Sequence, residues 1–155
     1  MSIKSESHFP RKLNVLLAED DKDDRLFFEE ALAQLPVPVN LSIVYDGEQL
    51  MEQLTQRHKK LPHVLFLDLS MPRKNGFACL LEIKLNEKLQ KLPVIVLSTH
   101  FDEDMLNLVY KDAAHYYIQK PTDMSKLKTL IFQALTLIFQ NNSLPGKENF
   151  VLSGE

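Results

Sequence analysis

Short apolar runs alternate with longer amphipathic segments along most of this 155-residue chain. Apolar runs of about four to eight residues, bounded by polar turns, are typical of strands that are buried on both faces of a parallel sheet. The segments between the runs are long enough for the helices that connect parallel strands. We therefore expect strands at residues 13–18, 41–45, 64–67, 94–97 and 115–118.

The segments between these runs carry apolar residues at helical spacing. After the turn at residues 46–47, for example, Leu50, Met51 and Leu54 form one apolar stripe. Two helices are expected after the turns at residues 46–47 and 68–76, and three more at residues 23–35, 102–111 and 125–140. This alternation predicts an α/β fold with a doubly wound, five-stranded parallel sheet, right-handed crossovers and helices on both faces.

Length and composition favour a single globular domain. We assign residues 12–140 to this domain, residues 1–11 to a polar N-terminal extension and residues 141–155 to a polar C-terminal tail. The net charge of −3 gives no electrostatic reason to expect nucleic acid as a partner. No apolar stretch is long enough for a membrane span, and no signal peptide is expected. The single cysteine, Cys79, excludes an internal disulfide and favours a cytoplasmic protein.

Polar signals follow four of the five apolar runs. They are Glu19-Asp20-Asp21, Asp68, Ser98-Thr99 and Lys120-Pro121, each at the C-terminal end of its run. In an open α/β sheet, ligands bind in the crevice beyond the carboxyl ends of the strands. We therefore expect carboxylates, a hydroxyl and an ammonium group to meet at one edge of the sheet.

This combination suits a divalent cation and a phosphoryl group. Mg²⁺ prefers oxygen ligands, which Glu19 or Asp20 and Asp68 can supply if their strands are neighbours. Lys120 can pair with Asp68 or with a phosphoryl oxygen, and Ser98 can donate its hydroxyl to the same group. A carboxylate can also act as a nucleophile and form an aspartyl phosphate. Taken singly these residues are unremarkable, since acidic residues such as Asp21, Asp23 and Asp24 often only cap a helix.

With these motifs, the chain resembles the receiver domain of two-component response regulators over residues 13–140. The resemblance rests on Glu19-Asp20, on the segment from Asp68-Leu69-Ser70-Met71-Pro72 to Gly76, on Ser98-Thr99 and on Lys120-Pro121, in order and with fitting intervals. It implies a flavodoxin-like strand order, 2-1-3-4-5, which places the first strand beside the third. Within the family, the chain is most similar to single-domain receivers associated with phytochrome-type sensor kinases.

The resemblance also implies a role for each site residue. Asp68 is expected to be the phosphoacceptor and Lys120 the phosphate-sensing lysine. Mg²⁺ is expected to bind the side chains of Glu19, Asp20 and Asp68 and the backbone carbonyl of Ser70. Ser98 corresponds to the switch hydroxyl and Tyr117 to the rotating aromatic switch, although Tyr117 can also be read as a half-buried strand aromatic. The Lys120–Pro121 bond is expected to be cis.

The leading hypothesis is a phosphorylation-switched signalling module rather than an enzyme with its own substrate. It would take its phosphoryl group from a sensor histidine kinase and signal by contact with a target protein or by phosphorelay. Two alternatives are an aspartate-nucleophile phosphatase and an unphosphorylated receiver-like binding module. Ser70 argues against the phosphatase, because such enzymes carry an Asp-x-Asp motif at the nucleophile and Ser70 stands here at the second Asp position.

A homodimer is also expected from the sequence. The helix at residues 125–140 carries more apolar residues than one face can bury, and outward apolar surface often marks an interaction site. The tail residues Phe150, Val151 and Leu152 could cover this surface or cross to a neighbouring chain. A two-fold dimer through the last two helices, the fifth strand and the tail would bury it.

Overall fold

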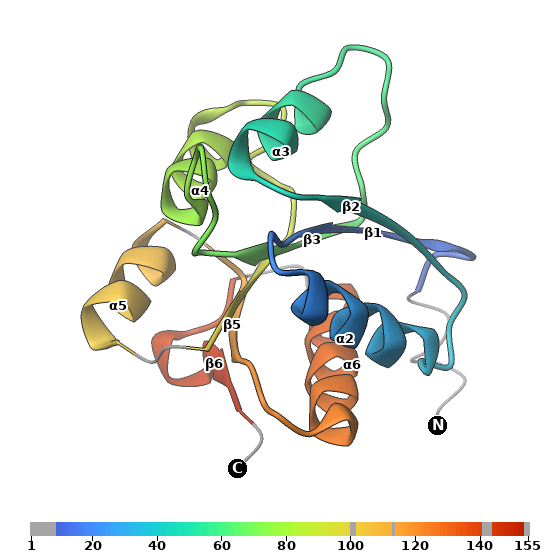
Figure 1. The fold of residues 1–155 in the computed structure, drawn as a ribbon. Helices are drawn as coiled ribbons and strands as arrows, with labels where there is room; N and C mark the ends of the chain where they lie inside the picture. The colour runs from blue at the N-terminus through green and yellow to red at the C-terminus, as the bar shows by residue number, and fades with distance from the viewer. Residues whose placement is uncertain (1–8, 100–101, 113, 141–143, 154–155) are drawn as a thin grey trace.

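A computed structural model describes residues 9–99, 102–112, 114–140 and 144–153. The described residues form one parallel sheet with helices on both faces (Figure 1). Its strands are β1 (Leu13–Ala18), β2 (Val39–Val44), β3 (Val64–Asp68), β4 (Val94–Ser98), β5 (Tyr116–Gln119) and β6 (Val151–Leu152). The helices are α2 (Lys22–Ala33), α3 (Gly47–Leu54), α4 (Gly76–Leu85), α5 (Glu103–Lys111), α6 (Met124–Gln140) and the 3₁₀ helix η1 (Lys147–Asn149).

The strand order is β2-β1-β3-β4-β5-β6. The first five strands therefore have the predicted order, and β1 lies beside β3, with Ala18 opposite Leu67. The sheet differs from the prediction by its sixth strand, β6, which pairs in parallel with β5 at the edge. This strand is formed by the C-terminal residues for which the sequence predicted only a polar tail.

Two apolar layers hold the helices against the sheet. One layer lies under α3, α4 and α5 and includes Leu50, Leu80 and Val109, whereas the other lies under α2 and α6 and includes Phe28 and Ile131. The central strands β3 and β4 are buried along their whole length, as parallel strands covered on both faces should be. The edge strand β2 alternates between exposed and half-buried residues until its last position.

Side-chain caps begin four of the helices. Asp21, Asp46, Asn75 and Asp102 each accept a hydrogen bond from a backbone N–H in the first turn of α2, α3, α4 and α5, respectively. These caps satisfy amides that have no partner within the helix and fix the residue at which each helix begins. No helix in the described part of the chain is both long and apolar enough to cross a membrane.

Candidate functional site

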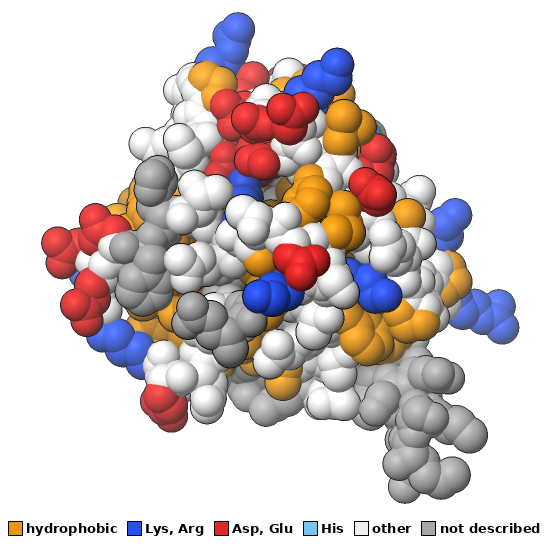
Figure 2. All heavy atoms as spheres, turned by 60° about the horizontal axis from the view of Figure 1, so that its bottom comes forward, with side chains coloured by type: hydrophobic (Ala, Val, Ile, Leu, Met, Phe, Trp, Pro, Cys, Tyr) orange, Lys and Arg blue, Asp and Glu red, His pale blue; other side chains and the backbone are white. Residues whose placement is uncertain are grey.

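The four polar motifs meet at the carboxyl edge of the sheet. Asp68 and Ser98 are the last residues of β3 and β4, Glu19 and Asp20 follow β1 directly, and Lys120 follows β5. β3 and β4 are neighbours, and Asp68 lies opposite Leu97, one position before Ser98. On the face shown in Figure 2, acidic side chains gather at one edge, close to basic and apolar side chains.

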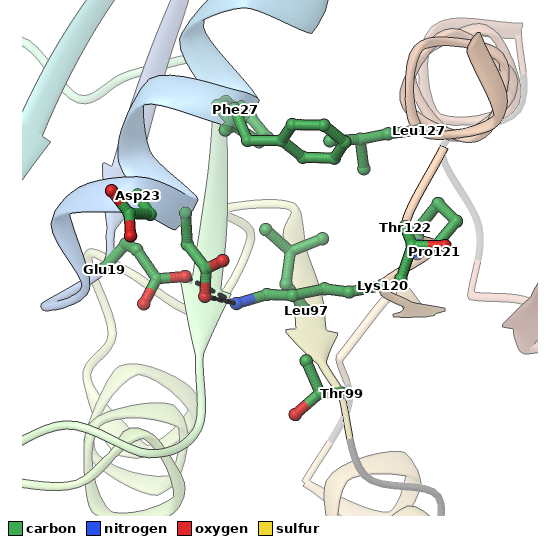
Figure 3. Close-up of a pocket in the computed structure, with 11 residues that line it drawn as sticks. Glu19, Asp23, Phe27, Leu97, Thr99, Lys120, Pro121, Thr122 and Leu127 are labelled. Carbon is green, nitrogen blue, oxygen red and sulfur yellow. Dashed lines mark hydrogen bonds and ion pairs between the residues drawn. The ribbon is translucent and has the colours of Figure 1, made fainter. Parts of the chain in front are cut away.

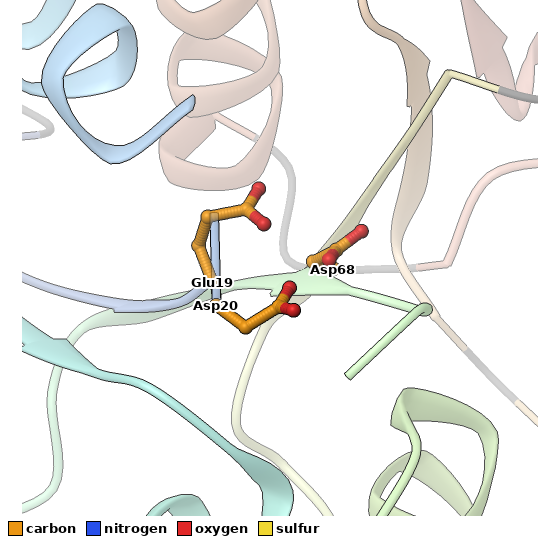
Figure 4. Close-up of side chains that lie close together, drawn as sticks. All are labelled: Glu19, Asp20 and Asp68. Atoms are coloured by element: carbon orange, nitrogen blue, oxygen red, sulfur yellow. The ribbon is translucent and has the colours of Figure 1, made fainter. Parts of the chain in front are cut away.

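Glu19, Asp20 and Asp68 form an acidic cluster. One carboxylate oxygen from each lies within 4.8 Å of the others, and Figure 4 shows the three side chains converging from the ends of β1 and β3. Oxygens bound to one Mg²⁺ at about 2.0–2.1 Å lie about 3–4 Å apart, so small side-chain movements would complete a site. Glu19 and Asp68 are buried while Asp20 is exposed, which leaves one side of the cluster open to water.

Lys120 is shared by three carboxylates. Its Nζ lies 2.6 Å from Glu19 Oε1 and 3.1 Å from Asp24 Oδ2 (Figure 3). It also lies 3.9 Å from Asp68 Oδ1. Burial alone would lower the pKa of Lys120, but the hydrogen bond and charge of Glu19, together with the charges of Asp68 and Asp24, leave it raised. Lys120 is therefore a fixed ammonium group beside Asp68.

The Asp68 carboxyl group retains its proton more readily than usual when no metal ion is bound. Burial and the charge of Glu19 raise the pKa of Asp68 from 3.8 to about 8, against the opposing effect of Lys120. A backbone hydrogen bond with Ser70 also opposes the rise. Two buried carboxylates repel each other unless a cation or a proton lies between them, so a metal ion bound here would take the place of the proton on Asp68.

Gly76 allows α4 to begin directly behind Asp68. A Cβ atom at this position would lie 2.5 Å from the carbonyl oxygen of Asp68 and 2.7 Å from Leu69 Cα. The Gly76 N–H also donates to the Leu69 carbonyl oxygen at 3.0 Å. Only a residue without a side chain fits so close, and the turn is thereby held against the end of β3.

Ser98 and Tyr117 form a second, buried part of the site. They are 6% and 1% exposed, respectively. Burial raises the pKa of Tyr117, and a side-chain hydrogen bond with Ser98 partly offsets this rise. Tyr117 therefore points into the protein toward Ser98, instead of lying half-buried on the strand.

The prediction of a cis bond between Lys120 and Pro121 is wrong, because this bond is trans. The β4–β5 ladder directs Lys120 instead. Its backbone N–H donates to the Ser98 carbonyl oxygen at 2.9 Å, which continues the ladder beyond Gln119. The strand itself thus carries the side chain to Asp68, and no sharp turn is required.

Two contributors to the site are not apparent from the sequence. The sequence indicates only a helix start for Asp24, yet its carboxylate pairs with Lys120. Arg25 donates to the carbonyl oxygens of Glu19 at 3.2 Å and Asp20 at 2.8 Å, and its guanidinium lies 4.5 Å from the centre of the Tyr45 ring. Arg25 therefore clamps the acidic loop, a role that no local motif signals.

A cavity of about 310 Å³ opens beside Lys120, between α2 and the start of α6. Its charged side is formed by Glu19 and Lys120, and its apolar side includes Phe27 and Leu127 (Figure 3). A hollow with one apolar wall and one charged wall can admit a partner side chain close to Asp68.

Comparison with known proteins establishes the family. Residues 15–132 match the family model of the response regulator receiver domain. The chain belongs to the response regulator receiver family. It is 32% identical over 121 residues to response regulator Rcp1 of Synechocystis sp., covering 76% of this chain and 82% of Rcp1. It is 28% identical over 120 residues to a probable chemotaxis protein CheY of Rhizobium etli, covering 77% and 90%, respectively.

Solved receiver structures share the fold. The Mn²⁺-bound form of response regulator Rcp1 matches with a TM-score of 0.74 and 30% identity, over 86% of this chain and 99% of that one. The phosphorylated cyanobacterial phytochrome response regulator RcpA matches with a TM-score of 0.75 and 33% identity, over 87% and 99%. The predicted family, fold and resemblance to phytochrome-associated receivers are confirmed. This receiver is a phosphorylation-switched module of two-component signalling, and its acidic cluster fits a divalent metal.

Proposed function

We propose that Asp68 is the phosphoacceptor of this receiver and that it takes its phosphoryl group from a phosphohistidine of a sensor histidine kinase. One observation carries the proposal: the Asp68 carboxylate at the end of β3 lies within reach of Glu19 and Asp20 on one side and of Lys120 on the other. An Asp68 oxygen would attack phosphorus as the P–N bond to the histidine breaks, so a P–O bond forms and the imidazole leaves.

We assign the metal to Mg²⁺, held by the side chains of Glu19, Asp20 and Asp68 and by the backbone carbonyl of Ser70. The donor set supports this choice, because it consists of oxygens and has an open, water-facing side at Asp20. When bound, the ion supplies positive charge that offsets the charge on the transferred phosphoryl oxygens. Arg25 keeps the loop that carries Glu19 and Asp20 in place.

Lys120 and Ser98 are assigned to the phosphorylated state. Lys120 lies 3.9 Å from Asp68 and can move a short distance to pair with a phosphoryl oxygen. Ser98, one position beyond the residue opposite Asp68, can donate its hydroxyl to the same group. Tyr117 of β5 is hydrogen-bonded to Ser98, so a movement of Ser98 would change the position of the Tyr117 ring in the apolar layer that it shares with α5.

The proposed partners are a sensor kinase before the transfer and a target or phosphotransfer protein after it, with the cytoplasm as the site of action. The cavity beside Lys120 offers the kinase a place to contact this edge of the sheet, where Lys120 lies at an ion-pair distance of 3.9 Å from Asp68. The homodimer stays a prediction. Its sequence argument assumed an outward apolar face on α6, but Phe132 and Phe139 of α6 are half-buried. Their ring centres lie 6.1 and 5.5 Å from that of Phe9, which covers part of this face. Sedimentation with and without a phosphoryl mimic tests it.

The phosphoacceptor is tested by labelling the full chain with acetyl phosphate and Mg²⁺. We expect an acid-stable, base-labile label that is lost in Asp68→Asn and kept in Asp104→Asn, a matched change of an exposed carboxylate on α5. Peptide mapping of the label identifies the residue directly. A label that persists in Asp68→Asn would assign the phosphoryl group to another side chain.

A further inference from the structure

The C-terminal segment, residues 144–153, lies at the edge of the sheet, where β6 is the neighbour of β5 (Figure 1). β6 pairs with β5 so that Tyr117 lies opposite Val151 and Ile118 opposite Leu152. The Tyr117 N–H donates to the Phe150 carbonyl oxygen at 3.0 Å. The segment is thus attached to the sheet at the backbone of the switch aromatic.

Phe150 is the side chain that anchors this segment. It is completely buried, and its ring centre lies 5.1 Å from that of Tyr110 and 6.5 Å from that of Tyr117. Tyr110 of α5 also donates its hydroxyl to the Pro145 carbonyl oxygen at 3.4 Å. Phe150 therefore fills the space between α5 and β5 and covers the Tyr117 ring.

These contacts form a continuous path to the phosphoacceptor. Phe150 contacts Tyr117, Tyr117 hydrogen-bonds Ser98, and Ser98 ends the strand next to β3, which ends at Asp68. Each residue on this path is less than 10% exposed. A change at one end can therefore alter packing at the other without passing through solvent.

We propose that Phe150 is a positioning residue of the switch: the docked C-terminal segment holds Tyr117 inside the protein, and phosphorylation of Asp68 and docking of this segment strengthen each other. The proposal rests on the proposed function, because it takes Asp68 as the phosphoacceptor. The proposal makes residues 144–153 part of the switch, as a segment of the same chain that packs over the Tyr117 ring.

The direction of the coupling follows from hydrogen-bond chemistry. A Ser98 hydroxyl that donates to a phosphoryl oxygen keeps its own oxygen free to accept from the Tyr117 hydroxyl. Such a chain of hydrogen bonds strengthens each member, so phosphorylation favours the inward Tyr117. The inward ring in turn completes the packing surface of Phe150. Coupling of two binding equilibria is reciprocal, so the docked segment must favour the phosphorylated state by the same factor.

The competing position of Tyr117 is outward. Tyrosine is amphipathic, and its hydroxyl can reach water when the apolar cover on its ring is removed. β6 has only two residues, and Phe150 and Leu152 are the two buried side chains of residues 144–153, so few side chains hold the segment in place. Phosphorylation can therefore shift such a weakly held segment measurably.

The experiment uses the full chain with Mg²⁺ and beryllofluoride as the phosphoryl mimic. Phe150→Ala removes the cover, Phe150→Leu restores much of it, and Leu144→Ala is the matched control, because Leu144 lies in the same segment but is 52% exposed. We expect Phe150→Ala to bind the mimic about three- to tenfold more weakly. Phe150→Leu should recover most of this loss, and Leu144→Ala should match the unmodified chain.

Hydrogen exchange at residues 150–152 provides a second readout. In the unmodified chain, the mimic should slow exchange of these amides several-fold. Tyr117→Phe keeps the ring under Phe150 but removes the hydroxyl, so it should leave the segment docked and abolish its response to the mimic. A role of Phe150 in packing alone would leave the response unchanged in Tyr117→Phe.

The outcomes separate this proposal from the proposed function. Equal or tighter mimic binding by Phe150→Ala, or exchange at residues 150–152 that ignores the mimic, would overturn the coupling even though Asp68 is labelled. An unmodified chain that neither takes the label nor binds the mimic would instead refute the proposed function. Protection that rises with protein concentration would assign the docked segment to a second copy and overturn the intramolecular contact.

Discussion

Replacing Asp68 by Asn should stabilise the metal-free protein while abolishing phosphorylation. Asp68 is 7% exposed and lies beside the buried carboxylate of Glu19, and these two effects raise its pKa from 3.8 to about 8. At pH 8, folding therefore requires either a buried charge or a retained proton. Asparagine has nearly the same shape and carries no charge, so Asp68→Asn removes this cost.

The magnitude and its sign follow from proton linkage. Below pH 3.8, Asp68 is protonated in both the folded and the unfolded chain, and the two proteins should be about equally stable. Between pH 3.8 and about 8 the folded state holds more protons, so the unmodified chain loses stability relative to the variant as the pH rises. Each pKa unit corresponds to about 1.4 kcal/mol. Because Asp20 leaves the cluster open to water, we expect only about 2–4 kcal/mol at pH 8.

Thermal unfolding at pH 5 and pH 8, with and without Mg²⁺, measures this effect. For a chain of this size we expect the melting temperature of Asp68→Asn to exceed that of the unmodified chain by about 5–10 °C at pH 8, and by less at pH 5. Mg²⁺ should narrow the gap, because it stabilises only a folded state that binds it. Asp104→Asn controls for the loss of one surface charge. An Asp68→Asn variant no more stable than the unmodified chain at pH 8 would refute the buried-charge argument.

Three further substitutions test the surroundings of the cluster. Lys120→Ala leaves the buried Glu19 without its cation, so the free energy of unfolding should fall by about 3 kcal/mol in denaturant titrations. The same variant should lose more of its response to beryllofluoride, the phosphoryl mimic, than of its affinity for Mg²⁺. Arg25→Ala frees the acidic loop and should weaken Mg²⁺ binding by about tenfold, measured calorimetrically. Burial lowers the pKa of His115, whose Nδ1 accepts a hydrogen bond from the Val94 N–H. The free energy of unfolding should therefore fall as the pH drops below 6.5, because the unfolded chain then binds a proton that the folded chain does not. His115→Asn should make the free energy of unfolding less dependent on pH in this range.

The fold was predictable because its strands are buried on both faces. A strand such as β3, whose five residues are all buried, must be apolar except where it ends at the site. Asp68 alone at the end of such a run is unremarkable, but Glu19-Asp20, Ser98 and Lys120 follow three other runs in the same way, and this joint placement predicts a site. The same reasoning located Ser98 and Lys120, and the structure brings all three to one edge of the sheet.

The sixth strand could not be predicted from local pattern. β6 has two residues within a polar segment, and its backbone hydrogen bonds exist only because the edge of β5 lies next to it. Parallel pairing of distant segments leaves no short-range signal, unlike a hairpin turn. The apolar residues Phe150, Val151 and Leu152 indicate that the tail packs against something, but their type does not show that β5 is the neighbour.

Asp24 shows a second limit of local reasoning. Asp23 and Asp24 are chemically identical and adjacent in the first turn of α2, so helix propensity treats them alike. Successive residues on a helix point about 100° apart, and therefore only one of the two can face Lys120. Which one does so depends on how α2 lies against β5, and this is decided by packing of the whole domain. The structure selects Asp24, at 3.1 Å from the ammonium group.

The charge balance of the site connects these observations. Glu19, Asp24 and Asp68 lie 2.6–3.9 Å from Lys120, and Asp20 joins Glu19 and Asp68 in the acidic cluster, so these carboxylates outnumber the one ammonium group that pairs with them. The metal-free protein meets this imbalance by keeping Lys120 charged and by holding a proton on Asp68, as the raised pKa of both groups indicates. A protonated carboxylic acid is a poor nucleophile, so Asp68 must lose this proton before it can attack phosphorus. Carboxylates that share a bound cation lose their protons readily. The same crowding that destabilises the empty site should therefore make the proposed phosphorylation of Asp68 depend on the metal.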